Sequence, residues 1–288
     1  FYTMNSWSMV DVLRGSEGEV VMDPAIKDFE GDSFVIQAQT GMELGGFGNR
    51  WLYYVGVVNG NIINPMGSVP GEDVFVFGAG KNTSSKDYYA GFAYKFGGLG
   101  FDGTGPGGDD PLSSRAEYWR DDSLTLSFFG YRGTGVVKVA LWDDKSRNVT
   151  SPHTTYNSGD DFWRVGAGAM YKHGNLTLNA GYMKGKNDDP YGILSDAEVE
   201  TDAWFVEGHY FVYPWLIPYL RYEGLYFSGL PSGILLDGEQ DREILTLGCK
   251  AHLRANVSLQ MEDTLYTRDD GYDYGLDNTI FLQLIAGF

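Results

Sequence analysis

Ionisable side chains at alternate positions of short segments are the residues of this sequence best placed to do chemistry. Glu207 and His209 stand two positions apart, as do Arg221 and Glu223, with apolar or aromatic residues around them. In an extended chain, residues at positions i and i+2 point to the same face. The spacing therefore predicts strands with one charged face and one apolar face, and the charged face could pair ions and order water.

Ten ionisable residues fall on the polar face of such segments. They are Glu43, Lys95, Lys138, Arg164, Lys172, Glu207, Arg221, Glu223, Lys250 and Glu262. We expect Arg221 to pair with Glu223 on its own strand and with Glu207 on the neighbouring strand. Two interpretations stay open at this point: the charges tune selectivity along a pore, or they only solvate and brace the wall.

The sequence contains no linear motif for catalysis, metal binding or nucleotide binding. There is no H-E-x-x-H and no G-x-S-x-G, and the glycine-rich stretch 98–108 opens no helix. The four histidines are His153, His173, His209 and His252, and they are scattered. The single Cys249 excludes an internal disulfide, a CxxC pair and a c-type haem attachment. We therefore expect no enzymatic activity, no cofactor and no metal site.

Period-2 alternation recurs along most of the chain and predicts strands. The 40 Gly, 20 Tyr, 17 Phe and 7 Trp favour antiparallel strands joined by turns. No apolar run approaches the roughly eighteen residues of a membrane-spanning helix. The C-terminal segment is the clearest case, because its apolar residues occupy every second position. These are Ile280, Leu282, Leu284, Ala286 and Phe288.

The connections between the predicted strands alternate between short and long. The short ones are 45–50, 80–86, 132–134, 173–175, 213–216 and 254–255. The long ones are 59–72, 98–121, 143–161, 184–202, 228–241 and 267–278. Sorting of this kind is typical of transmembrane barrels, which have tight turns on one side and long loops on the other. We predict an all-β, transmembrane, antiparallel up-and-down β-barrel with 13–14 strands, forming a single domain over residues 1–288.

The formal charge of −18 argues against a nucleic-acid partner, which would need a basic surface. The five long loops from residue 98 onward carry 22 of the 39 acidic residues. Asp269, Asp270 and Asp273 are examples. No loop has EF-hand spacing, so solvated loops are favoured over calcium sites. An acidic rim would still concentrate cations within a Debye length of about 8 Å.

Three stretches resemble known bacterial proteins. The strand that ends on Phe288 resembles the C-terminal insertion signal of outer-membrane proteins. Residues 1–61 resemble the phosphate-selective porins O and P, through Phe1, Ser6, Ser8 and the "WLYYVGVVNG" strand at 51–60, and "DYYAGFAYK" at 87–95 resembles that family's next repeat. The resemblance implies about three further strands upstream, hence sixteen. The segments "YKFGGLGFDG" and "WRDDSLTLSFFGY" resemble porins associated with multihaem cytochromes.

These patterns together predict an outer-membrane porin for passive diffusion of small hydrophilic solutes or ions. The wall alternates in sign, which departs from the dense lysine and arginine arrays of phosphate-selective porins. The alternative is a structural barrel that sheathes or docks a multihaem cytochrome. The expected partners are outer-membrane lipid, lipopolysaccharide, solutes or ions, and two further copies in a homotrimer.

Overall fold

The computed structural model describes eleven stretches of the chain, and every regular element in them is a β-strand. The stretches are 41–59, 66–68, 74–77, 86–104, 121–141, 154–188, 198–229, 235–237, 241–254, 257–269 and 279–286. Over these residues no helix has the length and apolar character needed to cross a membrane.

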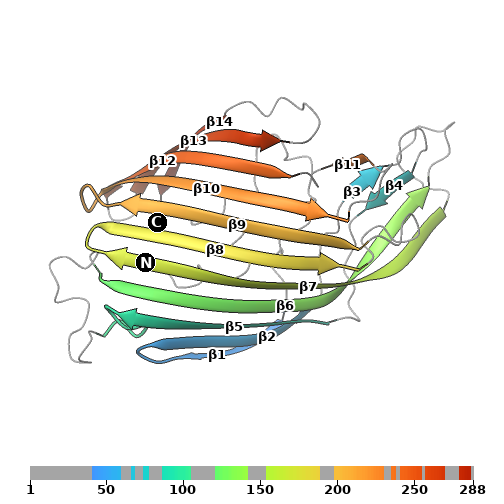
Figure 1. The fold of residues 1–288 in the computed structure, drawn as a ribbon, viewed down its shortest axis with the longest axis horizontal. Coiled ribbons are helices and arrows are strands. Elements are labelled where there is room, and N and C mark those ends of the chain that lie inside the picture. The colour runs from blue at the N-terminus through green and yellow to red at the C-terminus, as the bar shows by residue number, and fades with distance from the viewer. Residues whose placement is uncertain are drawn as a thin grey trace.

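Fourteen strands form one sheet, and eleven of them follow one another in chain order as an antiparallel meander (Figure 1). The eleven are β1 (Gly41–Phe47), β2 (Trp51–Asn59), β5 (Lys86–Gly97), β6 (Ser123–Leu141), β7 (Thr154–His173), β8 (Leu176–Asn187), β9 (Val199–Tyr210), β10 (Leu216–Ser228), β12 (Arg242–Arg254), β13 (Val257–Asp269) and β14 (Thr279–Ala286). This confirms the all-β, up-and-down prediction. Within the described stretches β1 and β14 do not pair with each other, so the sheet is not closed.

The register places the alternating residues as the sequence predicts. Between β13 and β14, Met261 faces Leu282 across the strands, and Gln260 faces Gln283. Met261 and Leu282 are exposed on one face of the sheet, and Gln260 is fully buried on the other. We call these the outer face and the inner face.

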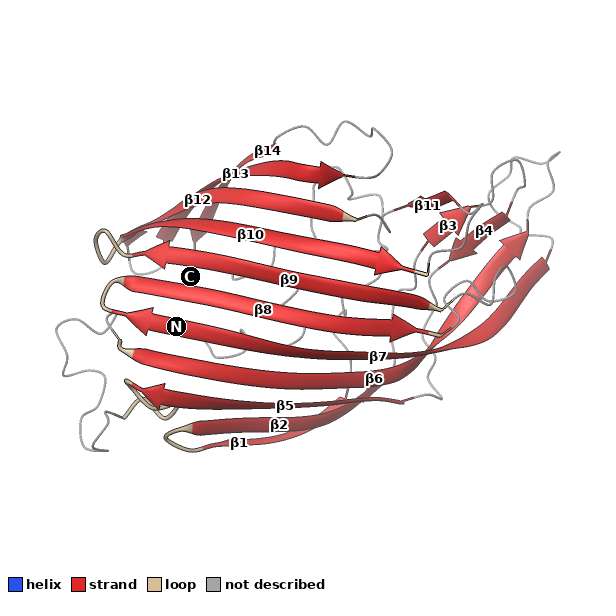
Figure 2. Ribbon diagram, viewed as in Figure 1, coloured by secondary structure: helices blue, strands red, loops and turns tan. Residues whose placement is uncertain are grey.

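The two ends of the meander differ in their connections (Figure 2). Short connections join β1 to β2, β7 to β8, β9 to β10 and β12 to β13, all at one end, called here the turn end. The other end is the loop end. Strand β5 also finishes at the turn end, where Arg50 Nη1 donates to the Gly98 carbonyl at 3.2 Å. The connection 98–121 therefore begins at the turn end, and the prediction that it lies with the other long loops, on the side opposite the tight turns, is wrong.

The predicted turn at 132–134 is also wrong, because β6 continues through it to Leu141. Gly133 has no side chain, and Asp87 and Phe162 lie where its Cβ would be. The glycine thus serves close packing within a sheet. With 19 residues β6 exceeds the roughly ten that a membrane strand needs, and so does its partner β7 with 20.

Three short strands extend the sheet at the loop end, as Figure 2 shows. They are β3 (Met66–Ser68), β4 (Val74–Phe77) and β11 (Leu235–Asp237). Strand β4 pairs with the extension of β6, β3 pairs with β4, and β11 pairs with β3. The predicted connections 59–72 and 80–86 imply a strand at 73–79, which is seen as β4 but lies off the main path. The predicted connection 80–86 lies almost wholly outside the described residues.

Large aromatic rings on the inner face lie over glycines of the neighbouring strand. The pairs are Tyr54 over Gly91, Tyr89 over Gly56, Phe129 over Gly166, Phe205 over Gly181 and Tyr219 over Gly248. A ring laid across a glycine covers the exposed backbone and fixes the register. Part of this layer forms the buried apolar cluster of Phe129, Tyr131, Phe162, Met183 and Phe205.

The glycine at position 248 gives a direct test of this packing. A methyl group in Gly248→Ala would collide with the Tyr219 ring and displace it from Glu262. We expect the free energy of unfolding to fall by about 1–3 kcal/mol, as for other overpacked sites. Gly130→Ala is the matched control, because its Cβ would meet nothing closer than 3.9 Å. Urea unfolding in detergent or lipid checks both, and equal effects would contradict the role given to the ring.

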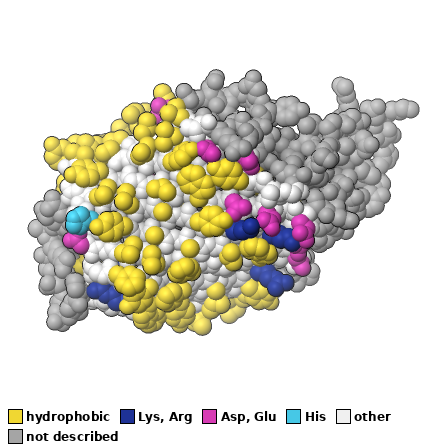
Figure 3. Space-filling model, viewed as in Figure 1, with side chains coloured by type: hydrophobic (Ala, Val, Ile, Leu, Met, Phe, Trp, Pro, Cys, Tyr) yellow, Lys and Arg dark blue, Asp and Glu magenta, His cyan; other side chains and the backbone are white. Residues whose placement is uncertain are grey.

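The outer face carries a broad apolar surface (Figure 3). Its exposed members come from strands across the whole sheet. They include Leu44, Tyr53, Val55, Phe92, Phe128, Val165, Val206, Leu220, Leu247, Met261 and Leu284. Aromatic residues gather near the turn end, among them Trp51, Tyr94, Phe96, Tyr171, Tyr210, Tyr213 and Trp215. Asp263 interrupts this surface, because it occupies an outward position opposite Leu247 and Ile280.

Candidate functional site

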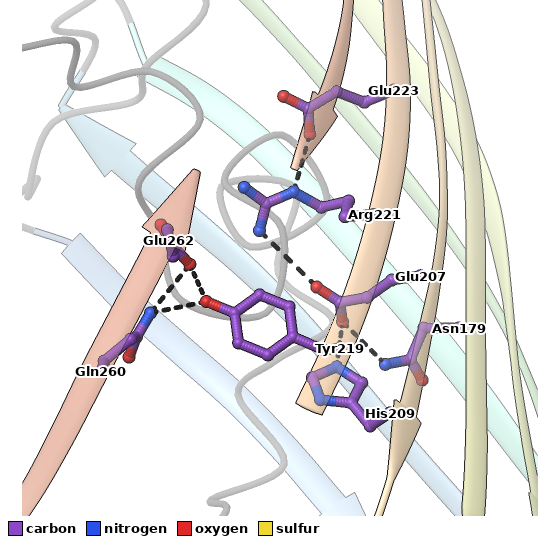
Figure 4. Close-up of polar contacts among 8 residues, drawn as sticks. All are labelled: Asn179, Glu207, His209, Tyr219, Arg221, Glu223, Gln260 and Glu262. Atoms are coloured by element: carbon purple, nitrogen blue, oxygen red, sulfur yellow. Dashed lines mark hydrogen bonds and ion pairs between the residues drawn. The ribbon is translucent and has the colours of Figure 1, made fainter. Parts of the chain in front are cut away.

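The inner faces of β8, β9, β10 and β13 bring eight polar or aromatic residues into one network (Figure 4). They are Asn179, Glu207, His209, Tyr219, Arg221, Glu223, Gln260 and Glu262. The antiparallel register aligns Asn179 with Glu207 and Glu207 with Arg221. We call this set the wall network.

Arg221 lies between two glutamates. Its Nε is 3.1 Å from Glu223 Oε2, and its Nη1 is 3.6 Å from Glu207 Oε2. Both predicted contacts of Arg221 are therefore present in the structure. Glu207 also contacts His209 Nε2 at 2.5 Å and accepts from Asn179 Nδ2 at 3.2 Å.

Glu262 joins the network from the far side of β12. Tyr219 on β10 reaches over Gly248 and donates its hydroxyl hydrogen bond to Glu262. Gln260 Nε2 donates to Glu262 Oε1 at 2.8 Å and to the Tyr219 hydroxyl at 3.1 Å. Absence of a side chain at Gly248 is what lets groups on β10 and β13 meet.

The wall network is buried and rich in carboxylates. Glu207 is 1% exposed, Arg221 2%, Glu223 8% and Glu262 4%. Buried charges are costly unless they are paired and hydrogen bonded, which explains the dense contacts. Two of the glutamates, Glu207 and Glu223, contact Arg221, and the third, Glu262, contacts Tyr219 and Gln260. Lys250 lies in the next row, opposite Gln260. The arrangement favours positive charge beside this wall.

A second charged group lies on the inner face near the turn end. Lys95 Nζ is 2.9 Å from Asp121 Oδ2, and Ser123 and the Leu99 amide also donate to this carboxylate. Burial alone would raise the pKa of Asp121, but the hydrogen bond and charge of Lys95, helped by Ser123, hold it below its usual range. Lys172, opposite Ser123 on β7, adds a second ammonium to the group.

Arg164 lies apart from both groups. Its guanidinium donates to Asn187 Oδ1 at 2.5 Å and to the Lys186 carbonyl at 3.0 Å, and it packs 5.6 Å from the Phe162 ring centre. It therefore braces β7 against β8. Buried Asp87 accepts from the Tyr131 hydroxyl at 2.8 Å nearby.

The remaining predicted residues are spread out. Glu43 is exposed on β1 and accepts from the Tyr89 hydroxyl at 2.6 Å. Lys138 lies on the extension of β6, opposite Phe77 of β4, beyond the stretch of β6 that pairs with β5. Phe288 lies outside the described residues. The structure thus groups Glu207, Arg221, Glu223 and Glu262, and it groups Lys95 with Lys172.

Sequence reasoning missed the neutral members of the wall network and the acidic partner of Lys95. Tyr219, Gln260, Asn179 and Asp121 were not singled out, although the first three share the inward phase of their strands with the chosen charges. Selecting every polar residue in that phase, and not only the charged ones, would have found them. Within the described stretches no group of three or more His, Cys, Asp or Glu is placed to hold a metal ion.

Comparisons with known proteins give a distant structural likeness. No family model matches the chain. No curated protein matches it either. Two solved structures of OmpT from Vibrio cholerae are similar, one expressed in the outer membrane and one folded in vitro. The first has 13% identity and a TM-score of 0.33, over 78% of this chain and 77% of that one. The second has 13% identity and a TM-score of 0.32, over 79% and 84%.

The side chains of the outer face indicate that this face of the sheet meets lipid. Its exposed apolar side chains span many strands, and its aromatic residues cluster toward the turn end. An apolar band edged by aromatic residues is the lipid-facing pattern of transmembrane barrels. The chain is an outer-membrane β-barrel protein. Its charged inner face is then the face turned away from lipid.

The comparison corrects one expectation from the sequence. The missing linear motifs led us to expect no enzymatic activity, yet the similar structures are outer-membrane proteins named OmpT, and a β-barrel fold does not decide between transport and catalysis. The physical reason for this correction is that the members of the wall network come from four strands far apart in sequence. A motif search cannot detect such a constellation, so the exclusion of catalysis is withdrawn.

Proposed function

We propose that the barrel forms a water-filled channel for passive diffusion of small hydrophilic solutes or ions. The observation that carries the proposal is the wall network, a dense set of charged groups on the inner face of a sheet whose outer face is apolar. Selectivity in such pores follows from the width and the wall charge.

Both the wall network and the acidic loops favour cations. Glu207, Glu223 and Glu262 outnumber Arg221 in the wall network. Lys95 and Lys172 oppose this near the turn end, and the acidic connection 98–121 also begins there. Since charges of both signs line the wall, the proposal is a modest cation preference, without phosphate selectivity.

Reversal potentials across planar bilayers test both parts of this proposal. The full-length protein should give discrete conductance steps and, in a KCl gradient at low salt, a potential of the sign set by K⁺. The preference should decline at high salt, because screening shortens the reach of exposed charge. Neutralising Asp269, Asp270 and Asp273 together should reduce the preference. Protein that is folded but gives no conductance would refute the channel, and anion preference would refute the selectivity.

The remaining partners stay predictions. A homotrimer, contact with lipopolysaccharide and docking of a multihaem cytochrome each follow from the sequence resemblance. No contact among the described residues favours the cytochrome over the channel.

A further inference from the structure

The wall network has more hydrogen-bond acceptors than donors. Besides the three carboxylates, it holds oxygens that no described residue donates to: Asn179 Oδ1 and Gln260 Oε1. Thr246 Oγ1 is a third oxygen without a described partner. Thr246 stands on β12 between Arg221 and Thr264, on the inner face, and is fully buried. A buried polar atom without a partner carries a penalty of about 1–3 kcal/mol.

The donors present do not saturate these acceptors. Arg221 lies 3.1 Å from Glu223 and 3.6 Å from Glu207, but its Nε and Nη1 make no well-directed hydrogen bond to either carboxylate. Gln260 Nε2 and the Tyr219 hydroxyl are both directed at Glu262. Asn179 Nδ2 is directed at Glu207. A group that stabilised this wall would have to bring donors and positive charge together.

The chemistry of the network selects among ligand classes. An anion would meet three glutamates, and a bare metal ion lacks a suitable set of ligands among the described residues. A sugar hydroxyl brings acceptors as well as donors. A protonated primary amine brings three N–H donors, a positive charge and no acceptor. We propose that the wall network is a binding subsite for the primary ammonium group of small organic cations.

This proposal deepens the proposed channel function by naming a solute class, and it rests on that function only for the route of entry. His209 and Asn179 are the less buried members of the wall network, so a solute in the lumen meets the network on their side. Glu207 lies directly behind both residues and is the first carboxylate within reach.

Calorimetric titration of the assembled full-length protein tests binding without any need for conductance. Propylammonium and tetramethylammonium carry the same charge, but only propylammonium can donate hydrogen bonds. We expect propylammonium to bind at least about tenfold more tightly, the value of one charge-assisted hydrogen bond. Equal affinities would overturn the subsite, and so would the absence of binding by either cation.

Substitutions locate the subsite. Glu262→Gln removes one charge and keeps the shape, and it should weaken propylammonium binding about tenfold. Thr246→Val removes only a hydroxyl group, and it provides the test if Glu262→Gln does not fold. Glu200→Gln on the outer face of β9 is the control, because it removes the same charge from an ion pair with Lys184 outside the network. Equal loss in the control, or no loss in both network variants, would overturn the proposal.

The outcomes separate the two proposals. Donor-dependent binding without conductance would sustain the subsite and refute the channel. Conductance without donor-dependent binding would sustain the channel and refute the subsite.

Discussion

Replacing Arg221 by methionine is expected to lower the free energy of unfolding by about 3–5 kcal/mol at neutral pH, the usual cost of breaking a buried ion pair. Methionine fills similar space, so packing changes little. Glu207 and Glu223 would keep their buried carboxylates and lose the guanidinium between them. Urea titration of the barrel in lipid vesicles measures the loss.

Two controls show whether charge is the cause. Adding Glu207→Gln and Glu223→Gln to Arg221→Met removes the uncompensated charges and should restore most of the stability. Arg132→Met removes an exposed cation on β6 and should change stability by no more than about 0.5 kcal/mol. A triple variant as unstable as Arg221→Met alone would show that the arginine acts through packing.

The alternation in the sequence predicted the two faces of the strands well, because side-chain direction is set locally. Leu245, Leu247 and Cys249 take outward positions, and Thr246 and Lys250 take inward ones. A period of two requires no knowledge of the neighbouring strands. The prediction of Arg221 between Glu207 and Glu223 needed one further assumption, that β9 and β10 are neighbours. Glu223 shares the inward phase of β10 with Arg221, and Glu207 lies opposite Arg221 on β9.

Turns could not be predicted equally well, because glycine has two uses in a barrel. At 132–134 the residues Arg-Gly-Thr have the composition of a tight turn, yet Gly133 serves to admit Phe162 and Asp87. Gly174, by contrast, has a φ of 56° and does form the turn between β7 and β8. Only the tertiary structure distinguishes a glycine under a ring from a glycine in a turn.

The two errors in the predicted connections compensated each other further along the chain. Splitting β6 at 132–134 added one strand, and counting 73–79 in the meander added another. Every connection after β6 therefore kept its predicted end, whereas 98–121 was placed at the wrong end and 132–134 is not a connection, because β6 continues through it. The link from Tyr219 to Glu262 was beyond sequence reasoning, since it needs the register of β10, β12 and β13 and the missing side chain of Gly248.

A charge placed at two depths of one strand should show that the outer face meets lipid. Phe92 and Phe96 lie on the outer face of β5 and are 46% and 51% exposed. Phe92 is in the middle of the strand, opposite Tyr53 and Phe128, and Phe96 is next to its end at the turn end. Phe92→Arg should lower the free energy of unfolding by about 2–4 kcal/mol, and Phe96→Arg by about 0–1 kcal/mol, because the cost of a cation falls from the bilayer centre to the interface.

The pair is matched in residue type, strand, face and exposure, so depth is the variable that remains. Unfolding in lipid vesicles gives the two values, and the same measurement in short-chain and long-chain lipids should shift the difference with bilayer thickness. On a surface bathed in water both arginines would be solvated alike. Equal costs for the two variants would therefore show that β5 does not cross the membrane, and the outward apolar face would need another partner.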